Sequence, residues 1–188
     1  MQNSIPDILK SVYVAVCCGS VILVLVAFVW VSRRSSVSRV WEPLVPVVNG
    51  TLDRKYGSAV LRGTYQERPI LATQILGGAE NPDTFRIEMT TVSRGANWLV
   101  RYGSEKLFGK DQWYLQAGHE KLSQRLTDLD VLAEMQRWQG HPTISYRVDS
   151  GTLSYEEEGS VPKPERFQAQ LDLLLRFAQI NEQVNGLS

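Results

Sequence analysis

The first apolar segment of the chain has no polar stripe. Residues 11–32 form an uncharged run of 22 residues between Lys10 and Arg33. As a helix, this run would be about 33 Å long, close to the hydrocarbon core of a bilayer at roughly 30 Å. Because apolar residues would cover every face of that helix, the pattern predicts a single transmembrane helix.

A cleaved signal peptide is the alternative for an apolar run near an N-terminus. The apolar part of such a signal is usually about 7–15 residues long, and residues 29–32 lack the small-x-small pattern of a cleavage site. Cys17 and Cys18 lie inside the run, and we interpret them as small apolar residues of the span, with palmitoylation as the alternative. We therefore expect an anchor that is retained.

Alternation with a period of two dominates the next part of the chain. Between residues 84 and 92, Phe85, Ile87 and Met89 alternate with polar residues, which is typical of an antiparallel sheet with one buried face. Turns rich in Gly, Pro, Asn and Asp separate further strand-like segments, and the last pair reads as a hairpin. The predicted strands are 59–65, 70–76, 84–92, 98–102, 112–117, 143–148 and 152–156.

Helical spacing of apolar residues marks two later segments. The first covers residues 122–138, either as one helix or as two with a break near Thr127, and the second begins at Pro164. A short helix at 46–57 is also predicted, although Asn49-Gly50 inside it is a turn signal. Strands grouped before helices predict an α+β domain, an antiparallel sheet of five to seven strands packed by two or more helices.

In the last helix, the spacing divides the residues between two faces. The apolar stripe contains Phe167, Leu171, Leu174, Leu175 and Ala178, and the face expected to be wet contains Arg166, Gln170, Asp172 and Gln179.

These elements predict four parts of the chain. They are a tail at 1–10, the transmembrane helix at 11–32, a juxtamembrane linker at 33–45 and a soluble α+β domain at 46–188. The linker is too short to let the domain move far from the bilayer. We expect the domain to act at the membrane surface.

Residues flanking the span predict its anchoring and orientation. Basic residues concentrate on its C-terminal side, which favours a cytoplasmic domain and a translocated N-terminal tail. Aromatic residues near the ends, and Trp41 beyond the linker arginines, are expected at the headgroups or on a partner. The expected membrane-anchoring residues are Tyr13, Trp30, Arg33, Arg34, Arg39 and Trp41.

Charge and cysteine content narrow the classes of function. From residue 41 onward the chain has 16 Lys and Arg against 19 Asp and Glu, which argues against a nucleic-acid partner. The same stretch has no cysteine, so disulfides, Cys-ligated metals and a Cys nucleophile are excluded there. Trp98, Trp113 and Trp138 fall on predicted buried faces, where core packing is the expected role.

Candidate catalytic and metal-binding residues are few. His119 and His141 belong to no metal-binding or metalloprotease pattern, and the run Glu156-Glu157-Glu158 lacks the spacing of a calcium loop and reads as a solvated loop. No nucleophile elbow or phosphate loop is present, and Gly109-Lys110-Asp111 resembles the latter only superficially. We expect no catalytic residues, no metal and no cofactor.

The sequence therefore predicts a non-enzymatic function. The expected protein is a single-pass accessory, assembly or scaffolding subunit. Its partners are the lipid bilayer and an integral membrane protein complex, such as a respiratory or photosynthetic one. The alternatives are a membrane-tethered lipid or small-ligand carrier and a membrane-tethered enzyme using carboxylates such as Glu88 or Asp111.

Overall fold

A computed structural model describes residues 20–24, 39–55, 58–77, 82–92, 95–104, 111–117, 120–128, 131 and 142–184. The chain divides into two compact units, Met1–Arg39 and Val40–Ser188. In the first unit, Ser20–Val24 is helical. Among the described residues, no helix is long and apolar enough to cross a membrane, and most of the predicted span at 11–32 lies outside them.

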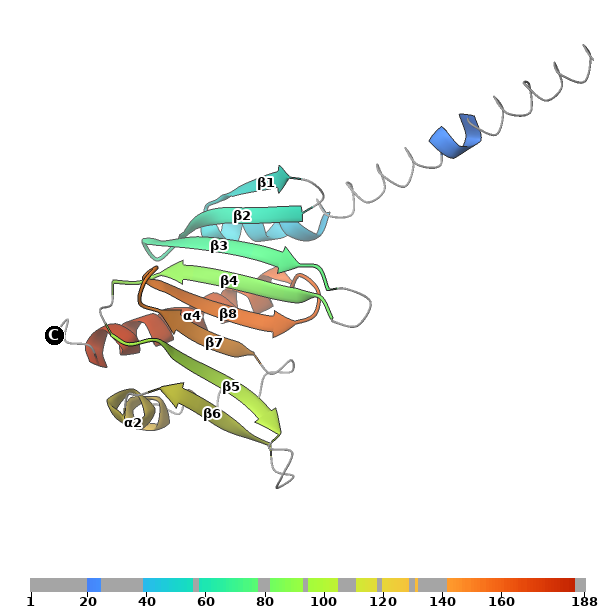
Figure 1. Ribbon diagram of the computed structural model, residues 1–188. Helices are drawn as coiled ribbons and strands as arrows, with labels where there is room; N and C mark the ends of the chain where they lie inside the picture. Colours follow the sequence, from blue (N-terminus) through green and yellow to red (C-terminus); the bar gives the residue numbers. More distant parts are fainter. Residues whose placement is uncertain are drawn as a thin grey trace, which may run out of the picture. The chain divides into compact units, whose positions relative to one another are not determined.

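The second unit is built on a single antiparallel sheet (Figure 1). The predicted α+β class with an antiparallel sheet is confirmed, and the sheet has eight strands where five to seven were expected. The strands are β1 (Thr51–Lys55), β2 (Ser58–Tyr65), β3 (Arg68–Ile75), β4 (Thr84–Thr90), β5 (Trp98–Ser104), β6 (Asp111–Ala117), β7 (Thr143–Arg147) and β8 (Thr152–Glu158).

The order of strands in the sheet differs from their order in the chain. It runs β1-β2-β3-β4-β8-β7-β5-β6, so the β7–β8 hairpin is inserted between β4 and β5. Ile87 of β4 is opposite Tyr155 of β8, and Ile144 of β7 is opposite Val100 of β5. This register places the fully buried apolar residues of neighbouring strands on one face of the sheet.

The predicted helix at 46–57 is wrong in its second half. A 3-10 helix, η1 (Glu42–Val48), ends at Asn49, which has a left-handed φ of 46°, and β1 follows. The Asn-Gly turn signal therefore outweighs the helical spacing. Gly63 of β2 allows η1 to approach closely, because a Cβ there would lie 2.4 Å from the Val48 carbonyl oxygen.

Within the described residues of the second unit, two α-helices, α2 and α4, accompany the sheet. The helix predicted to begin at Pro164 is confirmed as α4 (Pro164–Val184). The first predicted helix is represented by α2 (Glu120–Asp128), in which Leu122 and Leu126 are buried. Beyond α2, the rest of the predicted segment up to Trp138 lies outside the described residues, apart from Val131.

One face of the sheet carries the core. Phe85 and Ile87 of β4 and Leu153 and Tyr155 of β8 are at most 1% exposed. Phe85 packs between Trp41 before η1 and Phe167 of α4, with ring centroids 5.8 and 6.0 Å apart. Aromatic burial of this size contributes strongly to folding, and it joins η1 and α4 to the same face.

The opposite face of the central strands is mostly polar, and its polar side chains are half-buried except for Ser154, which is 9% exposed. It carries Thr73 of β3, Arg86 and Glu88 of β4, Ser154 and Glu156 of β8 and Ser145 of β7. Such a face is typical of an antiparallel sheet with one solvated side. We call these six residues the open face.

Candidate interaction surface and polar sites

Only two of the six predicted anchoring residues lie in the described part of the chain. Arg39 is helical and exposed, whereas Trp41 is 2% exposed and packs against Phe85. The expectation that Trp41 rests on headgroups or a partner is therefore corrected, because its ring belongs to the domain core. Tyr13, Trp30, Arg33 and Arg34 lie outside the described residues.

The burial of Trp41 and Leu44 also moves the domain boundary. The second unit begins at Val40, six residues before the predicted start of the domain at 46. The connector between the apolar run and the folded unit is correspondingly shorter than the predicted linker of residues 33–45.

Apolar side chains are exposed around the whole circumference of the helical stretch Ser20–Val24. Val21 and Ile22 are each 59% exposed, Leu23 is 71% exposed and Val24 is 67% exposed. Four consecutive residues of a helix point in directions about 100° apart, so they sample every face. After Ser20, the four residues 21–24 present only apolar side chains to their surroundings.

Arg86 is the centre of charge on the open face. Its guanidinium lies 2.8 Å from the Glu156 carboxylate and 3.9 Å from that of Glu88, and all three side chains are about one-third exposed. The two ion pairs hold the Arg86, Glu88 and Glu156 side chains in place on this surface. Charged side chains of this kind are found in non-obligate protein interfaces.

The three consecutive glutamates belong to β8, so their prediction as a solvated loop is wrong. Glu156 pairs with Arg86, Glu158 is exposed, and Glu157 points to the covered face with 8% exposure. The period-two geometry of a strand sends the middle residue inward. Among the described residues, no group of three His, Cys, Asp or Glu side chains is placed to hold a metal ion.

Glu157 accepts hydrogen bonds from Tyr155 of β8 and from two residues near the start of α4. The Tyr155 hydroxyl and the Gln170 amide nitrogen each donate to its Oε2 over 2.8 Å, and Arg166 donates to its Oε1. Gln170 is 1% exposed, which corrects its prediction on the wet face of the helix. Paired in this way, a buried carboxylate is tolerated within the core.

Tyr155 beside Glu157 is unsuited to proton abstraction. Burial, followed by the nearby Glu157 carboxylate, raises the pKa of the Tyr155 hydroxyl far above its ordinary value. A catalytic base or nucleophile needs a pKa near the working pH, so the Tyr155 hydroxyl serves here as a hydrogen-bond donor to Glu157.

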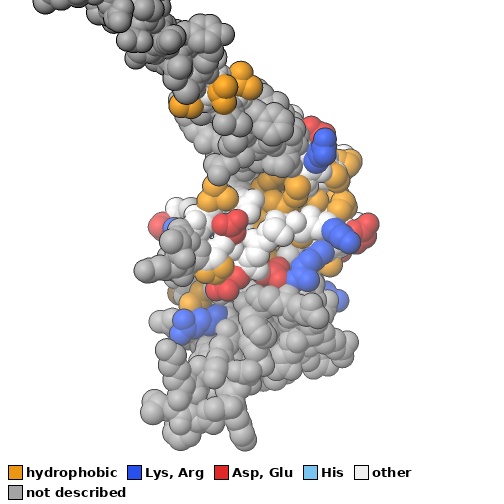
Figure 2. Space-filling model, turned by 90° about the vertical axis from the view of Figure 1, so that its right-hand side faces the viewer, with side chains coloured by type: hydrophobic (Ala, Val, Ile, Leu, Met, Phe, Trp, Pro, Cys, Tyr) orange, Lys and Arg blue, Asp and Glu red, His pale blue; other side chains and the backbone are white. Residues whose placement is uncertain are grey.

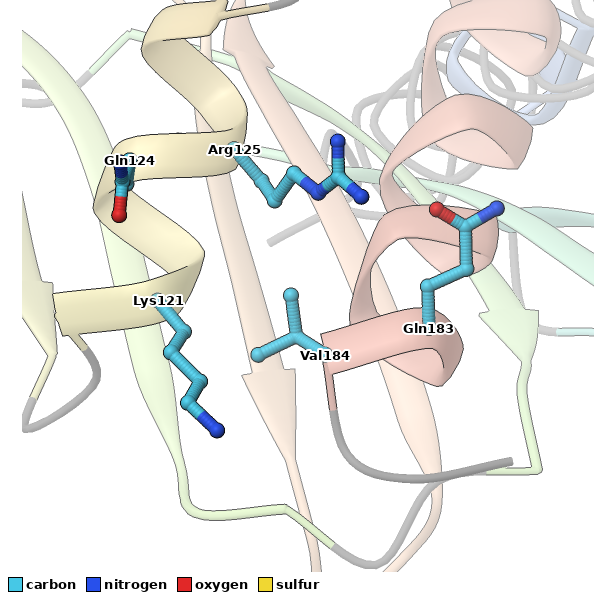
Figure 3. A pocket seen from close by; sticks show the side chains of 5 residues that line it. All are labelled: Lys121, Gln124, Arg125, Gln183 and Val184. Carbon is cyan, nitrogen blue, oxygen red and sulfur yellow. The ribbon is translucent and has the colours of Figure 1, made fainter. Parts of the chain in front are cut away.

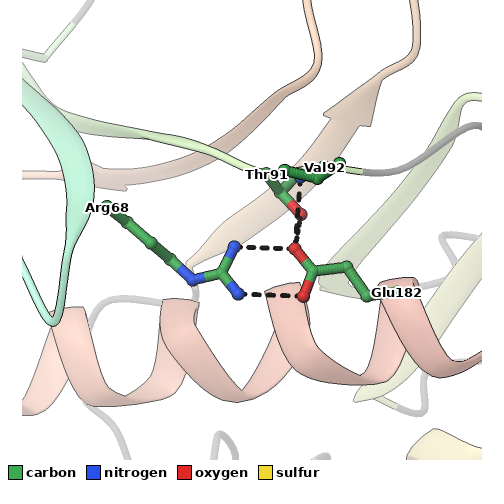
Figure 4. Close-up of polar contacts among 4 residues, drawn as sticks. All are labelled: Arg68, Thr91, Val92 and Glu182. Atoms are coloured by element: carbon green, nitrogen blue, oxygen red, sulfur yellow. Dashed lines mark hydrogen bonds and ion pairs between the residues drawn. The ribbon is translucent and has the colours of Figure 1, made fainter. Parts of the chain in front are cut away.

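A second carboxylate ties the end of α4 to the sheet. Figure 4 shows the Arg68 guanidinium facing Glu182, with two hydrogen bonds of 2.7 and 2.8 Å. The Thr91 hydroxyl donates to Glu182 Oε1 over 2.6 Å, and the Val92 backbone N–H donates to the same oxygen over 3.2 Å. Three separate segments therefore meet at one carboxylate.

The charges of this cluster are mutually stabilised. Partial burial alone would raise the pKa of Glu182, but the bonds from Arg68, Thr91 and the Val92 N–H outweigh it and lower that pKa below its ordinary value. The hydrogen bond to Glu182 likewise raises the pKa of Arg68. Glu182 is therefore ionised at neutral pH and serves as a fixed acceptor.

A surface pocket of about 360 Å³ lies beside this cluster, between α2 and α4. Figure 3 shows Arg125 extending from α2 towards α4, with Val184 between the helices. The described lining residues offer two cations and two amides; they are Lys121, Gln124, Arg125, Gln183 and Val184. A small anion could accept hydrogen bonds from these donors. The positive charges of Lys121 and Arg125 also interact favourably with the partial negative charge at the C-terminus of α4.

The remaining candidate catalytic residues are not brought together in the described structure. Glu88 pairs weakly with Arg86 on the open face. His119 and His141 lie outside the described residues, and only the backbone of Asp111 is described, in β6. No described arrangement unites a nucleophile with a base.

Sequence reasoning missed both the Glu182 cluster and the pocket. Arg68 and Glu182 are 114 residues apart and share no motif, so no sequence signal joins them. The i, i+4 spacing of Lys121 and Arg125 on one helix would have indicated a shared basic face. Comparisons with protein-family models, curated proteins and solved structures gave no significant match to this chain.

Proposed function

We propose that the protein is a membrane-anchored, non-enzymatic accessory subunit whose α+β domain binds a larger integral membrane complex. The observation that carries this proposal is the exposure of Val21, Ile22, Leu23 and Val24, each at least 59% exposed, within an uncharged run of 22 residues. A helix that is apolar on every side is stable only inside protein or lipid.

The domain supports a binding role in preference to catalysis. Its core face is filled by aromatic and aliphatic side chains, and the pocket between α2 and α4 lacks a carboxylate or an imidazole among its described lining residues. The open face presents fixed charges around Arg86, and protein interfaces of the non-obligate type are about as polar as the rest of a surface. We propose the open face as the surface that contacts the partner.

Purification of the full-length chain in a mild detergent, followed by native mass spectrometry, tests the proposal. We expect a stoichiometric complex with an integral membrane protein. Replacing Arg86 with Glu places three acidic residues together on the open face and is expected to weaken that complex at least tenfold. The matched change Arg176→Glu, on an exposed position of α4, which packs on the opposite face of the sheet, is expected to leave it intact. Recovery of the wild-type chain without a partner would contradict the proposal.

The pocket favours one second function, the binding of a small anion by the tethered domain. Lys121 and Arg125 supply charge, and Gln124 and Gln183 supply amide donors. Isothermal titration with inorganic phosphate, compared between wild type and Lys121→Gln/Arg125→Gln, distinguishes this function. Heat of binding that is lost in the variant would support it, and equal traces would exclude it.

A further inference from the structure

Exposed aliphatic side chains occur at the end of the sheet where the chain enters the domain. Val40 is 45% exposed, Ile75 is 42% exposed and Leu76 is 66% exposed. We call these three residues the tether end. Figure 2 views the domain from the side on which β3 and β8 end, and hydrophobic side chains gather there beside charged ones.

The connectivity of the domain links these residues. Val40 precedes Trp41, whose ring packs on Phe85 at 5.8 Å, and Phe85 follows Thr84, the register partner of Ile75. The position where the chain enters the domain and the end of β3 are therefore neighbouring parts of the second unit.

A set of hydrogen bonds holds the end of β3 in place. The carboxylate of Asp83 accepts from the Gly77 backbone N–H over 2.9 Å and from the Gln74 amide over 3.1 Å. The Asp83 carbonyl also accepts from the Gly159 N–H over 2.8 Å. Ile75 and Leu76, which are 42% and 66% exposed, therefore lie between two residues, Gln74 and Gly77, that are both bonded to Asp83.

The length of chain before Val40 determines what can cover these side chains. From Ser32, the last residue of the uncharged run, to Val40 there are eight residue steps, which span at most about 28 Å when fully extended. This connector carries Arg33, Arg34 and Arg39, which suit lipid phosphates. The tether end is therefore the part of the domain that is restricted to the neighbourhood of the headgroups.

We propose that the tether end contacts the lipid surface, with Ile75 and Leu76 inserted at the boundary between headgroups and acyl chains. This inference rests on the proposed membrane anchor. Tethering gives the domain a high effective concentration at the bilayer, so two aliphatic side chains suffice for contact although they would not recruit a free protein. The contact fixes which end of the sheet faces the membrane.

Single-site fluorescence in the full-length chain tests the proposal. Cys17 and Cys18 are replaced with Ser, and one cysteine at Leu76, Val92 or Val24 is labelled with an environment-sensitive NBD group. Each protein is reconstituted in phosphatidylcholine vesicles with and without nitroxide-labelled lipids. Val92 is a matched control, because it is an aliphatic residue, 72% exposed, just beyond β4, whose strand runs antiparallel to β3 and ends at the opposite end of the sheet.

We expect the Leu76 label to emit at shorter wavelength and to be quenched by nitroxides at shallow depth, and the Val92 label to behave as in water. If the label at position 24 is quenched and the label at position 76 behaves like the label at position 92, the membrane anchor is supported and the lipid contact of Leu76 is overturned. If Val24 is not quenched, the anchor itself fails and the inference fails with it. Protection of Leu76 in native membranes but not in lipid vesicles would overturn the lipid contact in favour of a protein partner.

Discussion

In α4, the side chains of Phe167, Leu171, Leu174 and Phe177 are completely covered, whereas the apolar side chains of the helical stretch Ser20–Val24 are 59–71% exposed. Both segments are helices rich in aliphatic residues. α4 alternates these residues with Asp172, Arg176 and Gln179, which face outward. The difference shows that α4 buries its apolar stripe within the domain, whereas the apolar side chains of residues 21–24 are exposed, as the proposed membrane anchor requires.

Charged substitutions in the N-terminal segment are expected to have the strongest effect, a loss of membrane binding. The double change Leu23→Arg/Val24→Arg is expected to release the full chain from vesicles, because each arginine at the centre of a span opposes insertion by about 2.5–3.5 kcal/mol. Flotation of vesicles on a density gradient measures the bound fraction. The matched variant Ala169→Arg/Gln179→Arg, on exposed positions of α4, is expected to float like the wild type. Equal flotation of both variants would contradict the comparison.

The next largest effect lies in α4. Phe177 is fully buried and stacks on Trp98 at a centroid distance of 5.8 Å, so Phe177→Ala is expected to lower the free energy of unfolding by about 3–5 kcal/mol. Phe28→Ala, in the uncharged run, is expected to leave domain unfolding unchanged. Urea titration in detergent micelles, followed by tryptophan fluorescence, measures both. A similar loss in the two variants would mean that the run packs with the domain.

Polar contacts at the end of α4 provide a smaller and more specific test. Glu182→Gln leaves the partly buried Arg68 without its counter-charge and is expected to cost about 1–3 kcal/mol of stability. Glu165→Gln, on the exposed first turn of α4, is the control and is expected to change stability by less than about 0.5 kcal/mol. If the two variants unfold at the same urea concentration, the Glu182 cluster does not hold the helix.

The pH dependence of the free energy of unfolding is expected to show the smallest effect. Because the pKa of Glu182 is lower in the folded domain than its ordinary value of 4.5, its ionised form contributes stability above that value. That contribution is lost as the pH falls below 4.5 and through the folded pKa. Unfolding measured across this range is expected to depend on pH less steeply for Glu182→Gln than for wild type. Vesicle binding through the uncharged run is expected to stay constant over the same pH range. If the free energy of unfolding depends on pH equally in wild type and in Glu182→Gln, the lowered pKa is not that of Glu182.

Local patterns predict most strands of this fold because each strand has one wet face. Phe85, Ile87 and Met89 are buried in β4 and alternate with less buried polar residues, as predicted. The predicted hairpin is formed by β7 and β8 around the Asp-Ser-Gly turn. Insertion of this hairpin between β4 and β5 is not predictable from such patterns, because it depends on pairing between strands far apart in the chain. The misassigned helix at 46–57 shows that two apolar residues at helical spacing do not outweigh an Asn-Gly turn.

The candidate sites were harder to predict than the elements that carry them. Glu157 reads as part of a charged loop, but its strand position and the donors Tyr155 and Gln170 make it a buried acceptor. Trp41 reads as a headgroup residue from its place after the arginines, and contact with Phe85 places it in the core. Both differences arise from tertiary neighbours, which single-sequence patterns do not contain.

Alkaline carbonate extraction of membranes from cells that produce the full-length chain tests the proposed membrane anchor most directly. Carbonate strips peripheral proteins and leaves segments that cross the bilayer in place. We expect the protein to stay in the membrane pellet and to move to the soluble fraction only when detergent is added. Complete release by carbonate alone would contradict the membrane anchor, and with it the proposal of a membrane-tethered accessory subunit.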